Sequence, residues 1–531
     1  MSGNQARLRQ GRETQMTSAR HERVAQLVAT RGRGRVRVLV QMDEARTGSS
    51  SGLRSRLPQV SSSREVDEDV VEEHQEEVKA PEEEGVRREE AQGDEDEGYP
   101  GGPSDTSRLI WYHEHVARRV WEGERAAIKS VNHARKIFDI EIPEAQWFSD
   151  VVVVSGLSGL YMIGYGSVSH RMLGAFFKRW HKETSSFPLP VRELTITFYD
   201  VAFLLHLPIR GRLLDHSHIQ WIEAIEWMVD FLGMDPFMAE RECQATSGEL
   251  IRFSNLRELY EDHLVAAAEV EEEGDAFYVE YHRCITLRCW FMFLVGTMLF
   301  VDKSANYVDM TYLRYFIDLS RVQEWNWGGT ILGWIISYFY RIHGYEINPV
   351  YTDAMPRAAR YILQRGNNKV GPYRVYLNHI VHDDIQWTPF IGYGDVIPFD
   401  RIRLYFGWLP SRSNTMVKYL PEQCMRQFGH VQMILKSPFH VAPDTVTSRE
   451  IAAIFEDWAH HLVLKEYRSM VATKRWHCVD GYVTWFYRVS HPLVTPDAPG
   501  DPPRPSHEEI LENRQAEDDQ ATDILPVCQR I

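Results

Sequence analysis

Apolar residues recur at three- and four-residue steps between about residues 105 and 495, which is the spacing of one face of an α-helix. The same pattern predicts helices over 109–121, 172–180, 201–205, 216–232, 256–273, 284–300 and 330–341. The helix over 284–300 is the most apolar, so we expect it at the centre of the core. Strand-like alternation is short and rare. The sequence therefore predicts a mainly α fold with a few short β-strands, built as a single large helical domain with disordered termini.

One short stretch combines both kinds of pattern. After the helix over 172–180, Leu194 to Phe198 is interpreted as a short strand with Thr195 and Thr197 on one side. Asp200 then stands where an N-cap residue would begin a second helix at Val201. Such a compact unit needs neighbouring elements to bury its apolar faces.

Charge divides the 531-residue chain, whose net charge is −16, into a folded region and two tails. Residues 1–104 are basic as far as Arg56 and densely acidic from Glu65 to Glu97, and such charge runs predict disorder. The folded region is expected over 105–495, and the Pro- and acid-rich residues 496–531 are expected to be disordered. Four arginines alternate with Gly and Val in the basic part: Arg31, Arg33, Arg35 and Arg37. They can contact nucleic-acid phosphates non-specifically or serve as a nuclear import signal, or they belong to an unselected low-complexity extension.

Cysteine and hydropathy patterns indicate a reduced, non-membrane environment. Six cysteines in so long a chain do not form a disulfide framework. Cys284 and Cys289 have no second ligand pair after them, so they predict no zinc site. The apolar stretch 284–301 contains Arg288, and 331–342 is too short to cross a hydrocarbon core of about 30 Å. No membrane association is expected.

A long ordered string of residues resembles the plant mobile domain family, in its MAIN-like (maintenance of meristems) group, whose members are also called aminotransferase-like. The string consists of Arg179, Trp180, Glu183, Thr184, Phe187, Glu193, Thr195, Thr197, Asp200, Trp327, Gly328, Trp387, Pro389, Arg426, Gln427, Phe428 and Gly429. The resemblance covers roughly residues 100–495 and implies that these residues are structural. One departure is a family helix that is missing near 344–348, through either a gene-model artefact or decay of this copy.

No catalytic constellation accompanies this string. The sequence contains no metallophosphatase cluster, no lysine in an aminotransferase-like phosphate site, and no Walker A, dinucleotide-binding or nucleophile-elbow motif. We therefore predict no catalytic residue, no cofactor and no metal site.

Three groups of polar residues were weighed as alternatives. The densest ligand-like cluster, His379, His382, Asp383 and Asp384, is explained equally well by a solvated loop. His113 with His115, and His460 with His461, are expected to diverge, and His491 before a proline is interpreted as a helix end. Asp200, Asp309 and Asp384 can be proposed as a magnesium-binding carboxylate set, but spacing does not test whether they converge.

The resemblance implies a non-enzymatic nuclear scaffold or regulatory protein with a role in meristem maintenance, cell division and transposon-linked silencing. Its partners would be proteins not yet identified, with non-specific nucleic-acid contact through the N-terminal tail and no membrane. The alternative is a transposon-derived factor that acts on DNA, with possible metal-dependent nuclease chemistry. The nucleus is the expected location, with the cytoplasm as the alternative.

Overall fold

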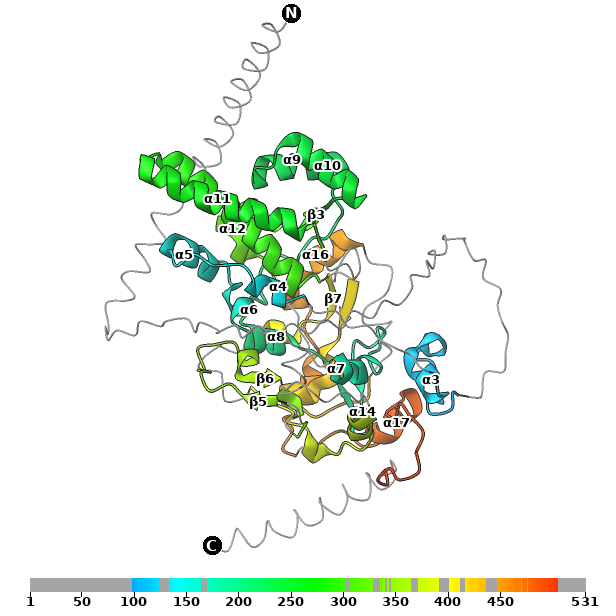
Figure 1. Ribbon diagram of the computed structural model, residues 1–531. Coiled ribbons are helices and arrows are strands. Elements are labelled where there is room, and N and C mark those ends of the chain that lie inside the picture. The colour runs from blue at the N-terminus through cyan, green and yellow to red at the C-terminus, as the bar shows by residue number, and fades with distance from the viewer. Residues whose placement is uncertain are drawn as a thin grey trace, which may run out of the picture. The chain divides into compact units, whose positions relative to one another are not determined.

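The computed structural model describes a large part of the chain beyond residue 97 (Figure 1). The described residues are 98–124, 133–163, 170–301, 306–327, 335, 337–339, 341–342, 345–363, 371–390, 401–410, 416–435, 447–468, 470–474 and 476–504. Residues 1–97 of the predicted N-terminal tail, which include the four alternating arginines, therefore lie outside the described residues. Gly328, most of the helix predicted over 330–341, and residues 505–531 also lie outside them.

The prediction of a mainly helical fold is confirmed. The α-helices are α3 Val116–Trp121, α4 Arg135–Phe138, α5 Gln146–Val154, α6 Ser158–Ile163, α7 His170–Phe177, α8 Phe198–Leu205, α9 Trp221–Leu232, α10 Pro236–Thr246, α11 Phe253–Glu273, α12 Ala276–Met298, α14 Gly371–Asn378, α16 Ser448–Glu456 and α17 Tyr482–Val489. Short 3-10 helices are η1 Tyr112–Glu114, η2 Met310–Tyr315, η3 Leu319–Glu324, η4 Arg357–Arg360, η5 His382–Asp384, η7 Arg401–Leu404, η8 Pro421–Phe428, η9 Trp458–His460 and η10 Lys465–Arg468.

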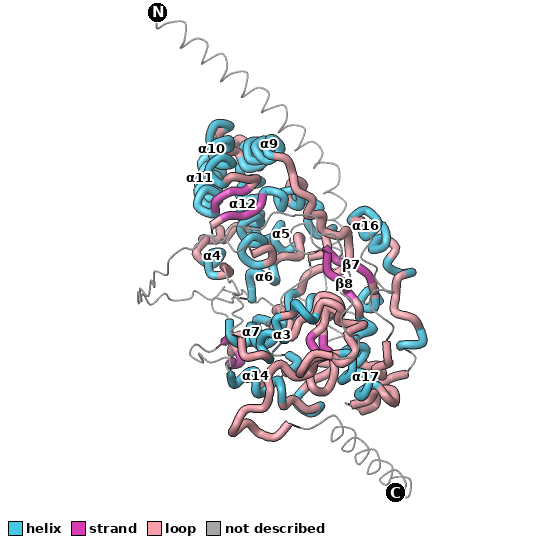
Figure 2. The backbone as a smooth tube through the Cα atoms, turned by 90° about the vertical axis from the view of Figure 1, so that its right-hand side faces the viewer, coloured by secondary structure: helices cyan, strands magenta, loops and turns pink. Residues whose placement is uncertain are grey.

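The strands form separate antiparallel pairs that connect the helical segments (Figure 2). The pairs are β1 Phe187–Pro188 with β2 Glu193–Leu194, β3 Leu250–Arg252 with β4 Tyr307–Asp309, β5 Tyr345–Ile347 with β6 Tyr361–Leu363, and β7 Gly407–Pro410 with β8 Met416–Tyr419. In the second pair Ile251 lies opposite Val308, so this pair spans the whole α11–α12 hairpin. Strand β5 occupies the region where the family pattern has a further helix.

Helix α12 lies at the centre of the main hydrophobic core, as predicted. It begins earlier than the pattern indicated, because the Asp275 side chain accepts hydrogen bonds from the backbone N–H groups of Phe277 and Tyr278. Its residues from Ile285 to Thr297 are buried, and it packs along α11 as a helical hairpin. None of the helices in the described part of the chain combines the length and apolar character needed to cross a membrane.

The predicted strand over Leu194–Phe198 is wrong. Strand β2 ends at Leu194, and α8 begins at Phe198 with Thr197 as its N-cap residue. The Thr197 side chain accepts from the backbone N–H of Asp200, whose carboxylate accepts from the backbone N–H of Thr197 at 2.6 Å. Asp200 is therefore the third residue of a capping box and not the N-cap.

The predicted helix over 109–121 is also interrupted. His115 has an extended backbone between η1 and α3, and its Nδ1 accepts from the backbone N–H of Ala117 at 3.2 Å. This contact caps α3, so the histidine ends one helical segment and begins the next.

Candidate functional site

The buried side chain of Arg179 binds three segments of the chain, two of them far away in the sequence. Its side chain is 1% exposed and donates to the backbone carbonyls of Pro188 at 3.0 Å and Pro492 at 2.6 Å. It also donates to the side-chain oxygen of Asn378 in α14. A planar guanidinium can serve several acceptors at once, which explains an arginine at this position. The neighbouring Trp180 packs edge-on against Phe187 with ring centroids 4.7 Å apart.

The carboxylates of the same segment are committed to internal partners. Glu193 pairs with Arg108 at 2.8 Å, and both side chains are at most 5% exposed. Burial raises the pKa of Glu193, while the positive charge and hydrogen bond of Arg108 oppose that rise. Glu183 accepts a hydrogen bond from the backbone N–H of Trp111 at 3.1 Å. These acids hold the segment around residue 110 against the core.

A buried hydrogen-bond network joins α8 to η8. The Gln427 side chain accepts from the backbone N–H of Thr195 and donates to the carbonyl of the same residue, both at 2.8 Å. Tyr338 makes side-chain hydrogen bonds to both Gln427 and Asp200. Burial is the main cause that raises the pKa of Asp200 to about 7, and its hydrogen bonds to Thr197 act in the opposite direction.

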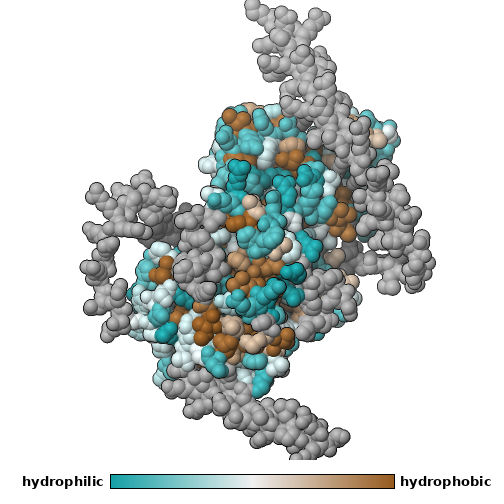
Figure 3. Space-filling model, turned by 180° about the vertical axis from the view of Figure 1, so that it is seen from behind, coloured by the Kyte–Doolittle hydropathy of each residue, from teal (hydrophilic) through white to brown (hydrophobic). Residues whose placement is uncertain are grey.

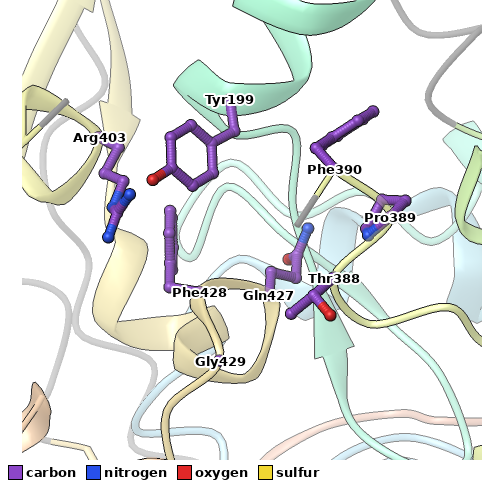
Figure 4. A pocket seen from close by; sticks show the side chains of 8 residues that line it. All are labelled: Tyr199, Thr388, Pro389, Phe390, Arg403, Gln427, Phe428 and Gly429. Atoms are coloured by element: carbon purple, nitrogen blue, oxygen red, sulfur yellow. The ribbon is translucent and has the colours of Figure 1, made fainter. Parts of the chain in front are cut away.

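A pocket of about 210 Å³ opens beside this network (Figure 4). It is lined by Tyr199, Thr388, Pro389, Phe390, Arg403, Gln427, Phe428 and Gly429. Tyr199 comes from the first turn of α8, and Phe428 is the last residue of η8. Their rings lie with centroids 6.0 Å apart, and the Arg403 guanidinium lies 4.5 Å from the centre of the Tyr199 ring. Pro389 and Phe390 form the opposite side of the pocket in Figure 4.

The pocket is suited to binding one side chain. Ordinary small-molecule sites have volumes of about 300–1,000 Å³, so this pocket is smaller than most of them. Its walls are mainly apolar and include three aromatic rings, with Thr388 and Arg403 as polar groups on its lining. The amide of Gln427 is already engaged by Thr195. The lining contains no pair of carboxylate, histidine or cysteine side chains that could act as acid and base.

The other predicted motif residues have structural contacts. Trp327 is fully buried and donates from Nε1 to the carbonyl of Val322 at 3.0 Å. The Arg192 guanidinium lies 4.8 Å from the centre of the Trp387 ring. Arg426 donates to the carbonyl of Lys474 at 2.8 Å. The hydroxyl of Thr184 bonds that of Ser186.

The carboxylate set proposed for magnesium does not gather within the described residues, where the only ligand-like group of three is formed by histidines. Asp200 belongs to the capping box, and Asp309 accepts from the backbone N–H of Thr311 at 2.8 Å. Asp384 pairs with Arg341 at 2.7 Å. In the other predicted cluster, which also contains Asp384, the Nε2 atom of His379 lies 2.6 Å from the Pro502 carbonyl oxygen.

The sequence did not predict this group of histidines. It consists of His115, His181 and His491, each of which had been overlooked or given a local explanation. No spacing rule could have found it, because His181 and His491 are 310 residues apart. The only local signal is the position of His181 inside the family-like string.

Comparisons with known proteins agree with the motif string. A family model described as plant mobile domain matches residues 156–344. Protein MAIN-LIKE 1 of Arabidopsis thaliana is 25% identical over 438 residues, covering 73% of this chain and 79% of that protein. Protein MAINTENANCE OF MERISTEMS of the same plant is 23% identical over 324 residues, covering 54% of this chain and 62% of that protein. A serine/threonine-protein phosphatase 7 long form homolog of the plant is 27% identical over 232 residues, which are 16% of its length. No solved structure matches.

Proposed function

Since the chain is a plant mobile domain protein that resembles the MAIN-like group, we propose that it acts as a non-enzymatic nuclear scaffold or regulatory protein. The role we assign to it is in meristem maintenance, cell division and transposon-linked silencing. The name of one relative, MAINTENANCE OF MERISTEMS, supports this assignment. The phosphatase name of another relative does not carry over, because the similar region is only 16% of that protein.

This proposal rests on one observation: the polar side chains of the family-like string are buried and bind other groups of the same chain. Arg179, Glu193 and Asp200 are each at most 3% exposed, and each has partners from within the chain. Catalysis needs acid, base or nucleophilic groups that a substrate can reach. A buried network of this kind instead fixes one arrangement of the surrounding elements, as a scaffold requires.

The pocket beside Tyr199 is the proposed contact for a partner protein. Its volume and aromatic walls fit one aromatic side chain, and the nearby Arg403 can donate to an acceptor next to it. On the face seen from behind, exposed apolar side chains lie in separate groups among hydrophilic ones (Figure 3). We therefore assign the partner contact to the pocket.

The test uses the full chain, tagged and expressed in Arabidopsis thaliana plants that lack Protein MAIN-LIKE 1. We expect a nuclear signal and correction of any meristem defect that these plants show. Thr388→Tyr should fill the pocket and abolish this correction. Proteins cross-linked to the tagged chain are also identified, and those that bind through the pocket should be present with the wild type and absent with Thr388→Tyr. Thr352→Tyr adds the same ring at an exposed loop position and should behave like the wild type.

Equal behaviour of these two variants would remove the pocket from the proposal. DNA cleavage by the purified chain with Mg²⁺, lost in Asp200→Asn, would replace the scaffold with the alternative of a DNA-acting factor. Removal of residues 1–56 separately tests the alternating arginines: salt-dependent nucleic-acid binding should disappear with them.

A further inference from the structure

Three histidines from distant parts of the chain meet beside residues 179–200, the first part of the family-like string and called the motif segment below. His115 precedes α3, His181 follows α7, and His491 follows α17. One ring nitrogen of each lies within 4.8 Å of those of the other two. His181 and His491 are 1% and 0% exposed, so two of the three rings are closed to solvent.

Burial favours the neutral form of all three rings. Burial is the largest cause that lowers the pKa of each histidine, and for His181 and His491 the pKa lies well below the usual value. The Nε2 atoms of His181 and His491 face each other in direct contact. A neutral imidazole presents a lone pair from one ring nitrogen, and this is the form that coordinates metal ions.

The surroundings of His181 match those of metal-binding histidines. Its Nδ1 is buried without a hydrogen-bond partner, and a Glu183 carboxylate oxygen lies 3.9 Å from it. The other oxygen of Glu183 is fixed by the backbone N–H of Trp111 at 3.1 Å. A ligating histidine commonly directs its second nitrogen to such a carboxylate, which orients the ring and raises its basicity.

We propose that His115, His181 and His491 bind one zinc ion. Three neutral imidazoles suit Zn²⁺, whose Zn–N bonds of about 2.0–2.1 Å place tetrahedral ligands about 3.3 Å apart. The 4.8 Å spread therefore closes, and the direct contact between His181 and His491 widens, with small side-chain movements. His115 would turn its Nε2 from the Trp180 carbonyl, which is 2.8 Å away, toward the ion. Its proton would move to Nδ1, which would give up the hydrogen bond from the backbone N–H of Ala117. Its ring already stacks on His181 with centroids 3.9 Å apart.

The ion would have a structural role. It would join the segment around residue 115, the motif segment and the end of α17, and Arg179 already connects the last two through Pro492. Because a complete site exists only in the folded chain, zinc binding would add to fold stability. The Cys284 and Cys289 pair is no part of this site, and the proposal does not depend on the scaffold function.

The experiment measures metal content and thermal stability of the full purified chain. Plasma mass spectrometry should find one equivalent of zinc, and a chelator should lower the melting temperature until one equivalent of zinc restores it. Cobalt(II) in place of zinc should give the visible d–d bands of a tetrahedral site. His115→Gln and His491→Gln should lose both the metal and the response to the chelator.

Two further variants keep the test independent of misfolding. His113→Gln changes an exposed ring two positions from His115 and should bind like the wild type. Glu183→Gln keeps an acceptor for Trp111 and should weaken zinc binding about 10-fold. Wild-type protein that is folded by circular dichroism but takes up no stoichiometric zinc or cobalt would overturn the proposal, and so would unchanged affinity in His115→Gln. The histidines would then form a hydrogen-bonded cluster only.

Discussion

The side-chain amide of Gln427 pairs with the backbone of Thr195, which lies 232 residues earlier in the chain. Each polar atom of the amide has one backbone partner at 2.8 Å, so the side chain takes the place of a neighbouring strand. This contact continues the direction of β2, which ends at Leu194, and attaches η8 to the beginning of α8. A glutamine is suited to this position because it offers a donor and an acceptor side by side.

Replacing Gln427 with Ala should destabilise the fold by about 2–4 kcal/mol, because the buried N–H and carbonyl of Thr195 both lose their partner. Chemical denaturation measures this as a lower midpoint with an unchanged slope. Gln220→Ala serves as the control, since Gln220 is exposed and makes no side-chain cap contact to α9. Equal midpoints for the two variants would contradict the pairing.

Asp200 should make stability depend on pH. Its folded pKa of about 7 lies above the ordinary aspartate value of 3.8, so the folded state holds a proton that the unfolded state releases. The contribution of this group is thus full below about pH 4 and is lost as pH rises to about 7. Asp200→Asn should gain stability relative to the wild type across that window, as measured by urea midpoints at a series of pH values.

A conservative change at the partner residue provides the comparison. Thr197→Ser keeps the hydroxyl that meets the Asp200 carboxylate. Its pH profile should keep the wild-type shape with at most a constant offset. Parallel profiles for Asp200→Asn and the wild type would show that the carboxylate does not titrate in this range.

Two glycines should respond to alanine in opposite directions. Gly429, at the end of η8, has a φ of +82°, and Gly174 lies within α7, where no such φ occurs. An added methyl group meets no atom within 4 Å at either position. Gly429→Ala should therefore cost about 1 kcal/mol through backbone strain, and Gly174→Ala should stabilise α7 by about 0.5–1 kcal/mol. Melting temperatures that move the same way in both variants would contradict this account.

Arg288 should be essential to α12 despite its apolar surroundings. It donates to the backbone carbonyls of Phe316 at 3.1 Å and Ile317 at 2.9 Å. Arg288→Met leaves these acceptors without that donor and should cost about 3 kcal/mol in the free energy of unfolding. Arg283→Met on the same helix breaks an ion pair with the exposed Glu271 and should cost about 1 kcal/mol or less. A smaller loss for Arg288→Met than for the control would refute the assignment.

The sequence pattern predicted the long helices because it follows local burial, which is one-sided in α11 and continuous along the second half of α12. The pattern over 256–273 matches α11, which begins at Phe253, and the apolar run over 284–300 lies mostly within α12. The strand error at Leu194–Phe198 had a different cause. Alternating threonines resemble a strand, yet Thr197 with an acid three residues later is also a capping box, and here the capping interaction determines the structure.

The site could not be predicted in the same way. The pocket joins α8, η7, η8 and the turn after Trp387, and nothing in the local pattern of any one segment indicates the others. The family-like string did identify Pro389, Gln427, Phe428 and Gly429 as special positions, and all four line the pocket. Their geometry depends on contacts that span hundreds of residues, such as the one between Gln427 and Thr195.

The contact between Arg179 and Pro492 has a consequence for synthesis on the ribosome. Translation at about 5–20 residues per second takes roughly 15–60 s to cover the 313 residues between them. Throughout that time the guanidinium lacks one of its final acceptors, so its complete burial is a late step in maturation. A chain that ends before residue 492 would leave this cation without the Pro492 carbonyl as an acceptor.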